Sequence, residues 1–212
     1  MLSIKLLETN KQIEEKILDA LAFEVNKKIK KLADDISELI GPFILEQFKN
    51  TDTYRSLISG DLKIEFGFYD EFEYMYVDPI LQKITDTIGV SYKTVSKKSW
   101  KGSLKIYILN DDLNLILNHE RASYISKTSG KDIDWLEWLL LRGDSYIIAD
   151  YNVLYGAGVG RSQGGIMVQS SRPWRVLPEY AGTQYDNWLT RTLDAYGQFI
   201  ADHIGKVIEE NI

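Results

Sequence analysis

The chain has 212 residues, no cysteine, an apolar fraction of 44% and a net charge of −6. Its length and composition are typical of a folded protein whose core needs neither disulfide nor structural metal, and no stretch approaches the 18 or so consecutive apolar residues of a membrane span. The lack of cysteine excludes thiol catalysis and thiolate metal sites, and the acidic balance argues against binding of nucleic acid through its phosphates.

A long N-terminal helix is the first predicted element. Apolar residues recur at steps of three and four from Ile13 to Leu39, as on an amphipathic helix, and Gly41-Pro42 is expected to end or kink it. A helix from about residue 10 to 40 would be ~45 Å long. That exceeds the width of a small domain, so we expect part of its apolar stripe to pack on another subunit. Four lysines on it are interpreted as a solvated face: Lys27, Lys28, Lys30 and Lys31.

Two short helices and a strand are predicted next. The helices cover about Pro42–Lys49 and Thr53–Ser59, with Gly60 as a left-handed C-terminal cap. Lys63–Phe68 alternates between polar and apolar residues, which predicts a strand.

A further helix and a hairpin are predicted before residue 110. Asp78-Pro79 has the cap and first-turn proline of a helix start, and Gly89 is expected to close that helix. Val90–Lys97 and Ser103–Leu109 are rich in β-forming residues and predict an antiparallel hairpin. Asp111–Lys131 fits a strand and a helix equally well, so both assignments stay open.

The C-terminal part is predicted to hold two helices and a second hairpin. Asp134–Arg142 reads as an apolar helix capped by Asp134 and Gly143. Strands at Ser145–Tyr155 and Ile166–Gln169 would flank a glycine-rich loop, Gly156–Gly165. A capping box of Thr183 and Asp186 would open the last helix.

These elements together predict an α+β fold in which a long N-terminal helix and a C-terminal helix pack on a mainly antiparallel sheet with hairpins. We expect one domain over residues 1–212, because no linker divides the chain. Its parts would be a helical region at about 1–60, a mixed β/α body at about 61–182 and a helix at about 183–210.

The glycine-rich loop contains one pattern that suggests an enzyme. Gly160-Arg161-Ser162-Gln163-Gly164 matches the G-x-S-x-G nucleophile elbow, and Asp194 and His203 follow in the order of a catalytic triad. The elbow needs a helix directly after the serine, but residues 165–169 have an extended pattern. We therefore expect no enzyme, and a serine hydrolase using Ser162 is kept as an alternative.

No cofactor or metal site is predicted. The segment from Gly156 to Gly160 is neither G-x-G-x-x-G nor a P-loop, and no helix follows it to receive a phosphate. The histidines, His119 and His203, have no partner at a metal-binding spacing.

Large aromatic residues crowd the C-terminal third, where they fit either a core or a protein interface. With the neighbouring arginines they suggest a surface for permanent contact between subunits. The candidate contact residues are Arg161, Trp174, Arg175, Tyr180 and Trp188.

The same region carries a pattern that resembles a family of viral proteins. It consists of Asp134-Trp135-Leu136-Glu137-Trp138-Leu139-Leu140, Gly160-Arg161-Ser162, Trp174-Arg175-Val176-Leu177-Pro178-Glu179-Tyr180-Ala181-Gly182-Thr183 and Asp186-Asn187-Trp188-Leu189-Thr190-Arg191. This pattern is similar to that of neck or tail-completion proteins, which join head and tail in tailed phages. Upstream, the opening helix with Tyr54-Arg55-Ser56-Leu57 and Gly60-Asp61-Leu62-Lys63 resembles the start of that family.

The resemblance implies a virion structural subunit made in the host cytoplasm. It would form a ring of its own copies, commonly six or twelve, and contact portal or connector proteins and tail tube or sheath proteins. It implies no catalytic residue, no cofactor, no membrane and no sequence-specific nucleic acid. Arg161 at the loop tip would become ordered against a neighbouring subunit or the tail. A generic cytosolic interaction module is the remaining alternative.

Overall fold

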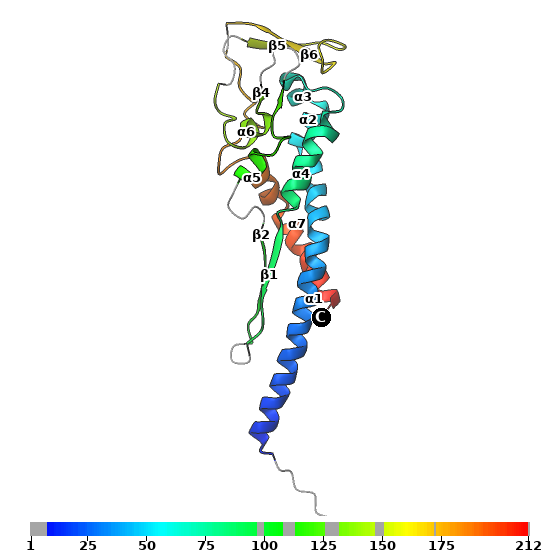
Figure 1. Cartoon of the computed structure of the whole chain (residues 1–212), viewed down its shortest axis with the longest axis vertical. Helices are drawn as coiled ribbons and strands as arrows, with labels where there is room; N and C mark the ends of the chain where they lie inside the picture. Colours follow the sequence, from blue (N-terminus) through cyan, green and yellow to red (C-terminus); the bar gives the residue numbers. More distant parts are fainter. Residues whose placement is uncertain are drawn as a thin grey trace, which may run out of the picture. The chain divides into compact units, whose positions relative to one another are not determined.

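The structure is a computed structural model that describes residues 8–96, 100–107, 113–125, 132–146, 151–171 and 173–211. It has a long N-terminal helix, a long C-terminal helix and small antiparallel strand pairs (Figure 1), which confirms the predicted α+β class. The helices are α1 (Asn10–Lys49), α2 (Asp52–Ser59), α3 (Asp61–Phe66), the π-helix η1 (Glu73–Val77), α4 (Asp78–Thr85), α5 (Asn114–Leu117), α6 (Trp135–Leu140) and α7 (Trp188–Asn211).

The described strands form three separate two-stranded antiparallel pairs. They are β1 (Gly89–Lys93) with β2 (Ser103–Tyr107), β3 (Tyr124–Ile125) with β4 (Asp132–Ile133), and β5 (Tyr151–Tyr155) with β6 (Gly165–Gln169). Both predicted hairpins are therefore confirmed, but residues 94–96 and 145–146 of the predicted strands are not in strands. Residues 97, 108, 109 and 147–150 of their predicted strands lie outside the described residues.

Contacts divide the chain into two compact units. The first comprises residues up to 40, 88–107 and 202 onward, and the second comprises residues 41–87 and 108–201. A single domain over the whole chain stays a prediction. Among the described residues, no helix combines the length and apolar content that crossing a bilayer requires.

In the first unit, the β1–β2 hairpin is joined to the first part of α1. The Asn26 side chain bonds to both backbone groups of Val95: its Oδ1 accepts from the N–H at 2.7 Å and its Nδ2 donates to the carbonyl at 3.3 Å. Leu32 and Ile36, both on α1, are 5% and 2% exposed. This confirms that the predicted apolar stripe forms a core along this part of the helix.

The second unit has an aromatic core. Phe68 and Phe72 stack with ring centroids 3.4 Å apart, and both meet the edge of Trp135, at 6.2 and 5.7 Å. Tyr124 also packs on both phenylalanines. Edge-to-face pairs of this kind add about 0.5–1.5 kcal/mol each to the effect of burial. Trp135 comes from α6, so the centre of the predicted apolar helix 134–142 is confirmed.

Pro42 does not end α1, so of the two predicted effects, an end or a kink, the end is wrong. The helix continues to Lys49, and the predicted second helix is its last part. A proline inside a helix removes one backbone hydrogen bond. Ile44 and Phe48 follow it with 1% and 0% exposure, and burying their side chains outweighs that loss.

The strand predicted at Lys63–Phe68 is wrong, because residues 61–66 form helix α3. Leu62, Glu65 and Phe66 are buried, and their spacing of three and four places them on one helical face. The left-handed cap is Gly67, with φ of 68°, whereas Gly60 has φ of −111°. The preceding helix α2 confirms the helix predicted at 53–59.

Asp78 begins helix α4 with Pro79 in the first turn, as predicted, but it is not an N-cap, because η1 leads directly into α4. Its carboxylate accepts instead from the Tyr54 hydroxyl at 3.0 Å and from Lys49 Nζ at 2.8 Å. Glu73 accepts from the same hydroxyl at 2.8 Å. Residues five apart share a face of a π-helix, so η1 brings both carboxylates to Tyr54. Burial and these two carboxylates raise the pKa of Tyr54.

Three smaller predictions also need correction. Helix α4 ends at Thr85, and Gly89 opens β1 instead of closing a helix. Asp134 makes no side-chain cap bond to α6. Gly143 is not a helix cap, since its N–H donates to the carbonyl of Gly182 at 3.1 Å. In the undecided stretch 111–131, α5 is helical and β3 is extended, while residues 111, 112 and 126–131 lie outside the described part.

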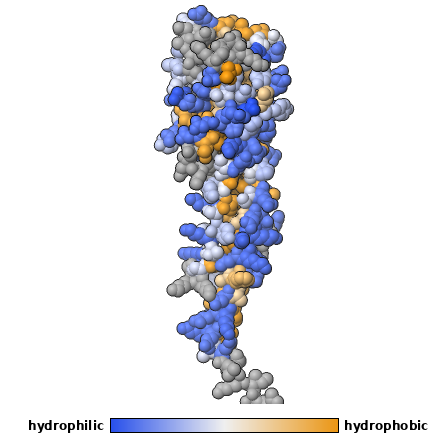
Figure 2. Space-filling view, viewed as in Figure 1, coloured by the Kyte–Doolittle hydropathy of each residue, from blue (hydrophilic) through white to orange (hydrophobic). Residues whose placement is uncertain are grey.

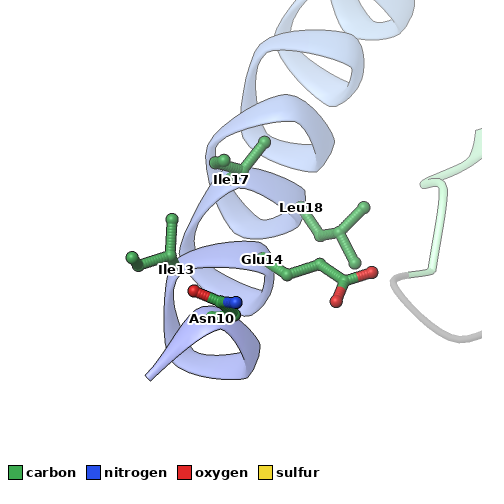
Figure 3. Close-up of a pocket in the computed structure, with 5 residues that line it drawn as sticks. All are labelled: Asn10, Ile13, Glu14, Ile17 and Leu18. Carbon is green, nitrogen blue, oxygen red and sulfur yellow. The ribbon is translucent and has the colours of Figure 1, made fainter. Parts of the chain in front are cut away.

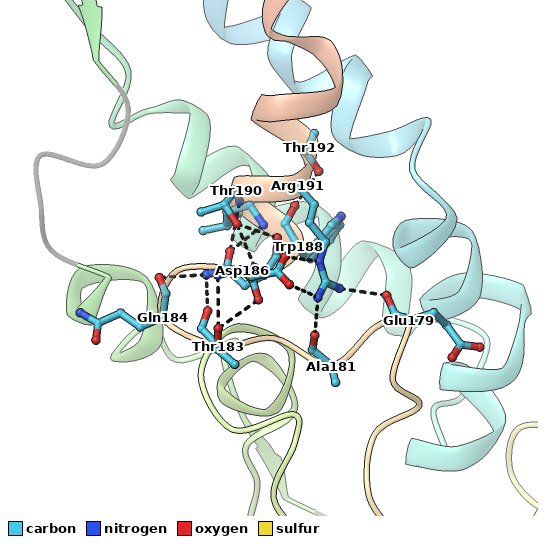
Figure 4. Close-up of polar contacts among 11 residues, drawn as sticks. Glu179, Ala181, Thr183, Gln184, Asp186, Trp188, Thr190, Arg191 and Thr192 are labelled. Atoms are coloured by element: carbon cyan, nitrogen blue, oxygen red, sulfur yellow. Dashed lines mark hydrogen bonds and ion pairs between the residues drawn. The ribbon is translucent and has the colours of Figure 1, made fainter.

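The start of α7 is capped by Asn187, not by the predicted pair of Thr183 and Asp186, which Figure 4 labels. Asn187 Oδ1 accepts from the N–H of Thr190 at 3.1 Å, and Thr190 Oγ1 accepts from the N–H of Asn187 at 2.9 Å. This reciprocal pair is a capping box. Thr183 and Asp186 lie in the turn before it, where Asp186 forms a two-bond ion pair with Arg191 at 2.6 and 2.9 Å.

Candidate assembly surface

The glycine-rich loop is a hairpin loop between β5 and β6, as predicted. It is held by its own backbone: the N–H of Gly156 donates to Gly164 and that of Gly158 to Gln163, both at 2.8 Å. Gly158 and Gly160 have φ of 73° and 72°, a left-handed conformation that favours glycine. A strand follows Ser162, so the loop lacks the helix that a nucleophile elbow and a phosphate-binding turn require.

Two glycines let the hairpin lie against helix α3. A Cβ on Gly164 would lie 2.6 Å from Ile64 Cδ1, and one on Gly165 would lie 2.8 Å from Ile64 Cγ2 and 2.7 Å from the carbonyl oxygen of Leu154. Real Cβ atoms do not approach other atoms so closely. These glycines therefore have a packing function that their sequence pattern did not reveal.

Arg161 is turned toward its own chain. It is half-buried, and its Nη2 would lie 3.2 Å from a Cβ on Gly67, the residue that ends α3. It also lies beside the hydroxyl of Tyr124, which donates to the carbonyl of Phe66 at 2.7 Å. Burial raises the pKa of Tyr124 to about 12, and Arg161 opposes that rise. Arg161 thus helps to hold the loop on α3, where the sequence suggested a side chain facing a neighbour.

Glu65 lies beneath the hairpin and was not singled out by the sequence. It is 7% exposed, and its Oε1 accepts from the Tyr155 hydroxyl at 3.1 Å. Burial raises its pKa to about 7, while Tyr155 and Trp174 lower it and Asp61 and Glu179 raise it further. Its other oxygen, Oε2, has no hydrogen-bond partner within the described part of the chain.

Among the described residues, none is placed to act as a catalytic partner of Ser162. This serine is 6% exposed, and its Oγ likewise makes no hydrogen bond to any residue that the structure describes. A serine nucleophile needs a base within hydrogen-bonding reach and access for its substrate. The described residues also contain no group of three acidic or histidine side chains that could hold a metal ion.

The predicted contact residues divide into buried and exposed ones. Trp174 is 8% exposed and packs on Phe66, and Trp188 is 2% exposed and donates from Nε1 to Thr51 Oγ1 at 2.9 Å. Both rings belong to the core of their own chain, so neither offers a face to a partner. Arg175 is exposed and Tyr180 half-buried, so both remain candidates for contact.

The outer face of the β5–β6 hairpin is apolar and exposed. Leu154 and Ile166 stand opposite each other in the strand register and are 52% and 40% exposed. Because side chains alternate along a strand, they point away from the face on which Val153 is buried. Figure 2 shows apolar side chains gathered over this hairpin. Alternation along the predicted strands places Leu154 and Val153 on opposite faces, but the sequence does not show which of the two faces the rest of the chain covers.

Comparison of the chain with known proteins gave no match to a protein-family model, a curated protein or a solved structure.

Proposed function

We propose that the chain is a structural subunit of a tailed-phage particle, a neck or tail-completion protein that forms a ring at the head-to-tail junction. The resemblance of residues 134–191 to that family is the starting point. The observation that carries the proposal is the exposed apolar face of the β5–β6 hairpin, centred on Leu154 and Ile166. An apolar face on a well-anchored hairpin is typical of a surface that another protein covers.

The packing of the motif residues agrees with a structural function. Trp135 and Leu136 are fully buried, Asn187 caps α7, and Gly182 lies against the backbone of Leu139. The residues that carry the resemblance thus stabilise the region that supports the hairpin. A subunit that acts by assembly needs this stability and no reacting group.

We expect the hairpin face to contact a neighbouring copy, a portal or connector protein, or a tail tube or sheath protein. Arg175 and Tyr180 are the remaining candidates for polar contacts. Trp174 and Trp188 stabilise the fold behind them, and Arg161 fixes the loop.

The test is the protein content of purified particles. Mass spectrometry of phage particles from a producing culture should detect this polypeptide in a constant ratio to the portal protein. Its absence from intact particles would disprove the proposal.

A surface variant connects the test to the hairpin. Leu154→Asp should reduce incorporation into particles at least tenfold, because it places a charge in the proposed contact. Gln169→Glu is the matched control, since Gln169 is exposed on the other face of the same hairpin, and it should be incorporated normally. Equal incorporation of both variants would show that this face is not the contact surface.

The serine hydrolase has less support, because Ser162 Oγ is buried and makes no hydrogen bond to a described residue. A fluorophosphonate probe should leave the folded protein unlabelled. Labelling that Ser162→Ala abolishes would support the enzyme.

A further inference from the structure

The first turns of α1 carry an apolar stripe whose side chains are exposed or half-buried. It consists of Ile13, Ile17 and Leu21, and is called the α1 stripe below. Their spacing of four residues places them on neighbouring turns of one helix side. Ile17 and Leu21 are 54% and 50% exposed, whereas Leu32 farther along α1 is 5% exposed.

The stripe contains a shallow hollow with a specific geometry. Its lining residues are Asn10, Ile13, Glu14, Ile17 and Leu18. Figure 3 shows Ile13 and Ile17 one turn apart on the same side of α1. The positions 10, 13, 14 and 17 are spaced i, i+3, i+4 and i+7, which is the arrangement of a hole that receives one side chain from a facing helix. The hollow is therefore shaped for another helix.

We propose that the helix that fills this hollow is α1 of a second copy, packed antiparallel about a two-fold axis at Ile17. The stripe is symmetric about that residue, with Ile13 four positions before it and Leu21 four positions after it. In an antiparallel pair, Leu21 of each copy enters the hollow of the other and lies beside Ile13. One short segment thus supplies both the inserted side chain and the hole, as an isologous contact requires.

The charges along α1 determine the direction of packing. In a parallel pair in register, Glu14 would face Glu14 and Glu24 would face Glu24 across the axis, and like charges in contact are unfavourable. The antiparallel pair places Glu24 beside Asn10, whose amide can donate to a carboxylate. The antiparallel arrangement therefore avoids both repulsions and adds a polar pair at each end.

This association goes beyond the proposed function and does not depend on it. A two-fold contact closes on itself, so it describes the form of the free protein. The interface is small, and we expect it to be weak.

Single-cysteine variants test the arrangement, because the chain has no cysteine of its own. Under mild oxidation, Ile17→Cys should form a disulfide-linked dimer. Ile13→Cys and Leu21→Cys should each stay uncrosslinked alone and form a mixed dimer when combined. Lys30→Cys, also exposed on α1, is the control and should not crosslink. Self-crosslinking at Ile13 and Leu21 would show parallel pairing and overturn the proposal.

Sedimentation provides an independent measurement. Wild-type protein at roughly 100 μM should contain dimer, and Leu21→Lys should weaken dimerisation at least tenfold with unchanged helical content, since the side chain is exposed. A wild-type protein that stays monomeric overturns the α1 pair. That outcome leaves the virion proposal intact, because the particle composition tests the virion proposal separately.

Discussion

Glu65 is the residue whose chemistry depends most on the fold. Its pKa is raised from 4.5 to about 7 by burial under the hairpin. A carboxyl group with a raised pKa holds its proton more tightly in the folded chain than in the unfolded one. Between about pH 4.5 and 7 the folded protein therefore binds more protons, and its stability falls as the pH rises.

Glu65→Gln should remove this pH dependence. The amide has the shape of the neutral acid and cannot ionise, so the variant should be more stable than wild type above pH 7 by roughly 2–4 kcal/mol. Below about pH 4.5 the two proteins should be similar. Urea unfolding at pH 4 and pH 8 measures the difference, and parallel pH profiles for the two proteins would contradict it.

Helices and strands were predicted well where a regular spacing of apolar residues extends over many residues. The apolar spacing from Ile13 to Leu39 predicted most of α1. The sequence does not show that Ile44 and Phe48 are buried, and their burial is what lets the helix continue beyond Pro42. Alternation over Lys63–Phe68 was too short to distinguish strand from helix. In a strand, the alternation would place Glu65 on the polar, solvent-facing side. The buried Glu65 carboxylate beneath the hairpin was therefore missed.

The seating of the hairpin on α3 gives a prediction for the β5–β6 element. Gly165→Ala should lower the free energy of unfolding by about 1–3 kcal/mol, because its methyl group would meet the backbone carbonyl of Leu154 and the side chain of Ile64. Gly197→Ala in α7 is the control, since a Cβ there has open space and helices favour alanine over glycine. Urea unfolding of both variants checks this, and equal stabilities would refute it.

Pro42 gives a prediction for α1. It is exposed, so replacing it removes little packing, and alanine can supply the helix hydrogen bond that proline lacks. Pro42→Ala should therefore raise the stability by about 1–3 kcal/mol. Thermal unfolding is the measurement, with Pro178→Ala in an exposed non-helical segment as the control. Destabilisation by Pro42→Ala would mean that the proline is required at this point of the helix.

For the whole molecule, charge is the property that the sequence determines most directly. With a net charge of −6, the protein should not bind duplex DNA at about 150 mM salt, because too few cations oppose the phosphates. Fluorescence anisotropy with a labelled duplex should stay constant up to ~10 μM protein. Binding that falls steeply with added salt would instead show that the lysines of α1 act as a phosphate-binding face.

The π-helical turn η1 contains one residue more than an α-helical turn needs, since the N–H of Asp78 donates to the carbonyl of Glu73 five residues before it. Deleting one residue between Glu73 and Val77 would let the backbone relax into an ordinary α-helix without loss of regular hydrogen bonding. Glu73 and Asp78 would then be four residues apart, and they would still share a helical face beside Tyr54. The same deletion in the regular part of α1 would turn every side chain on one side of it by about 100°. The η1 turn is therefore a place where the chain can lose a residue without rearranging the aromatic core.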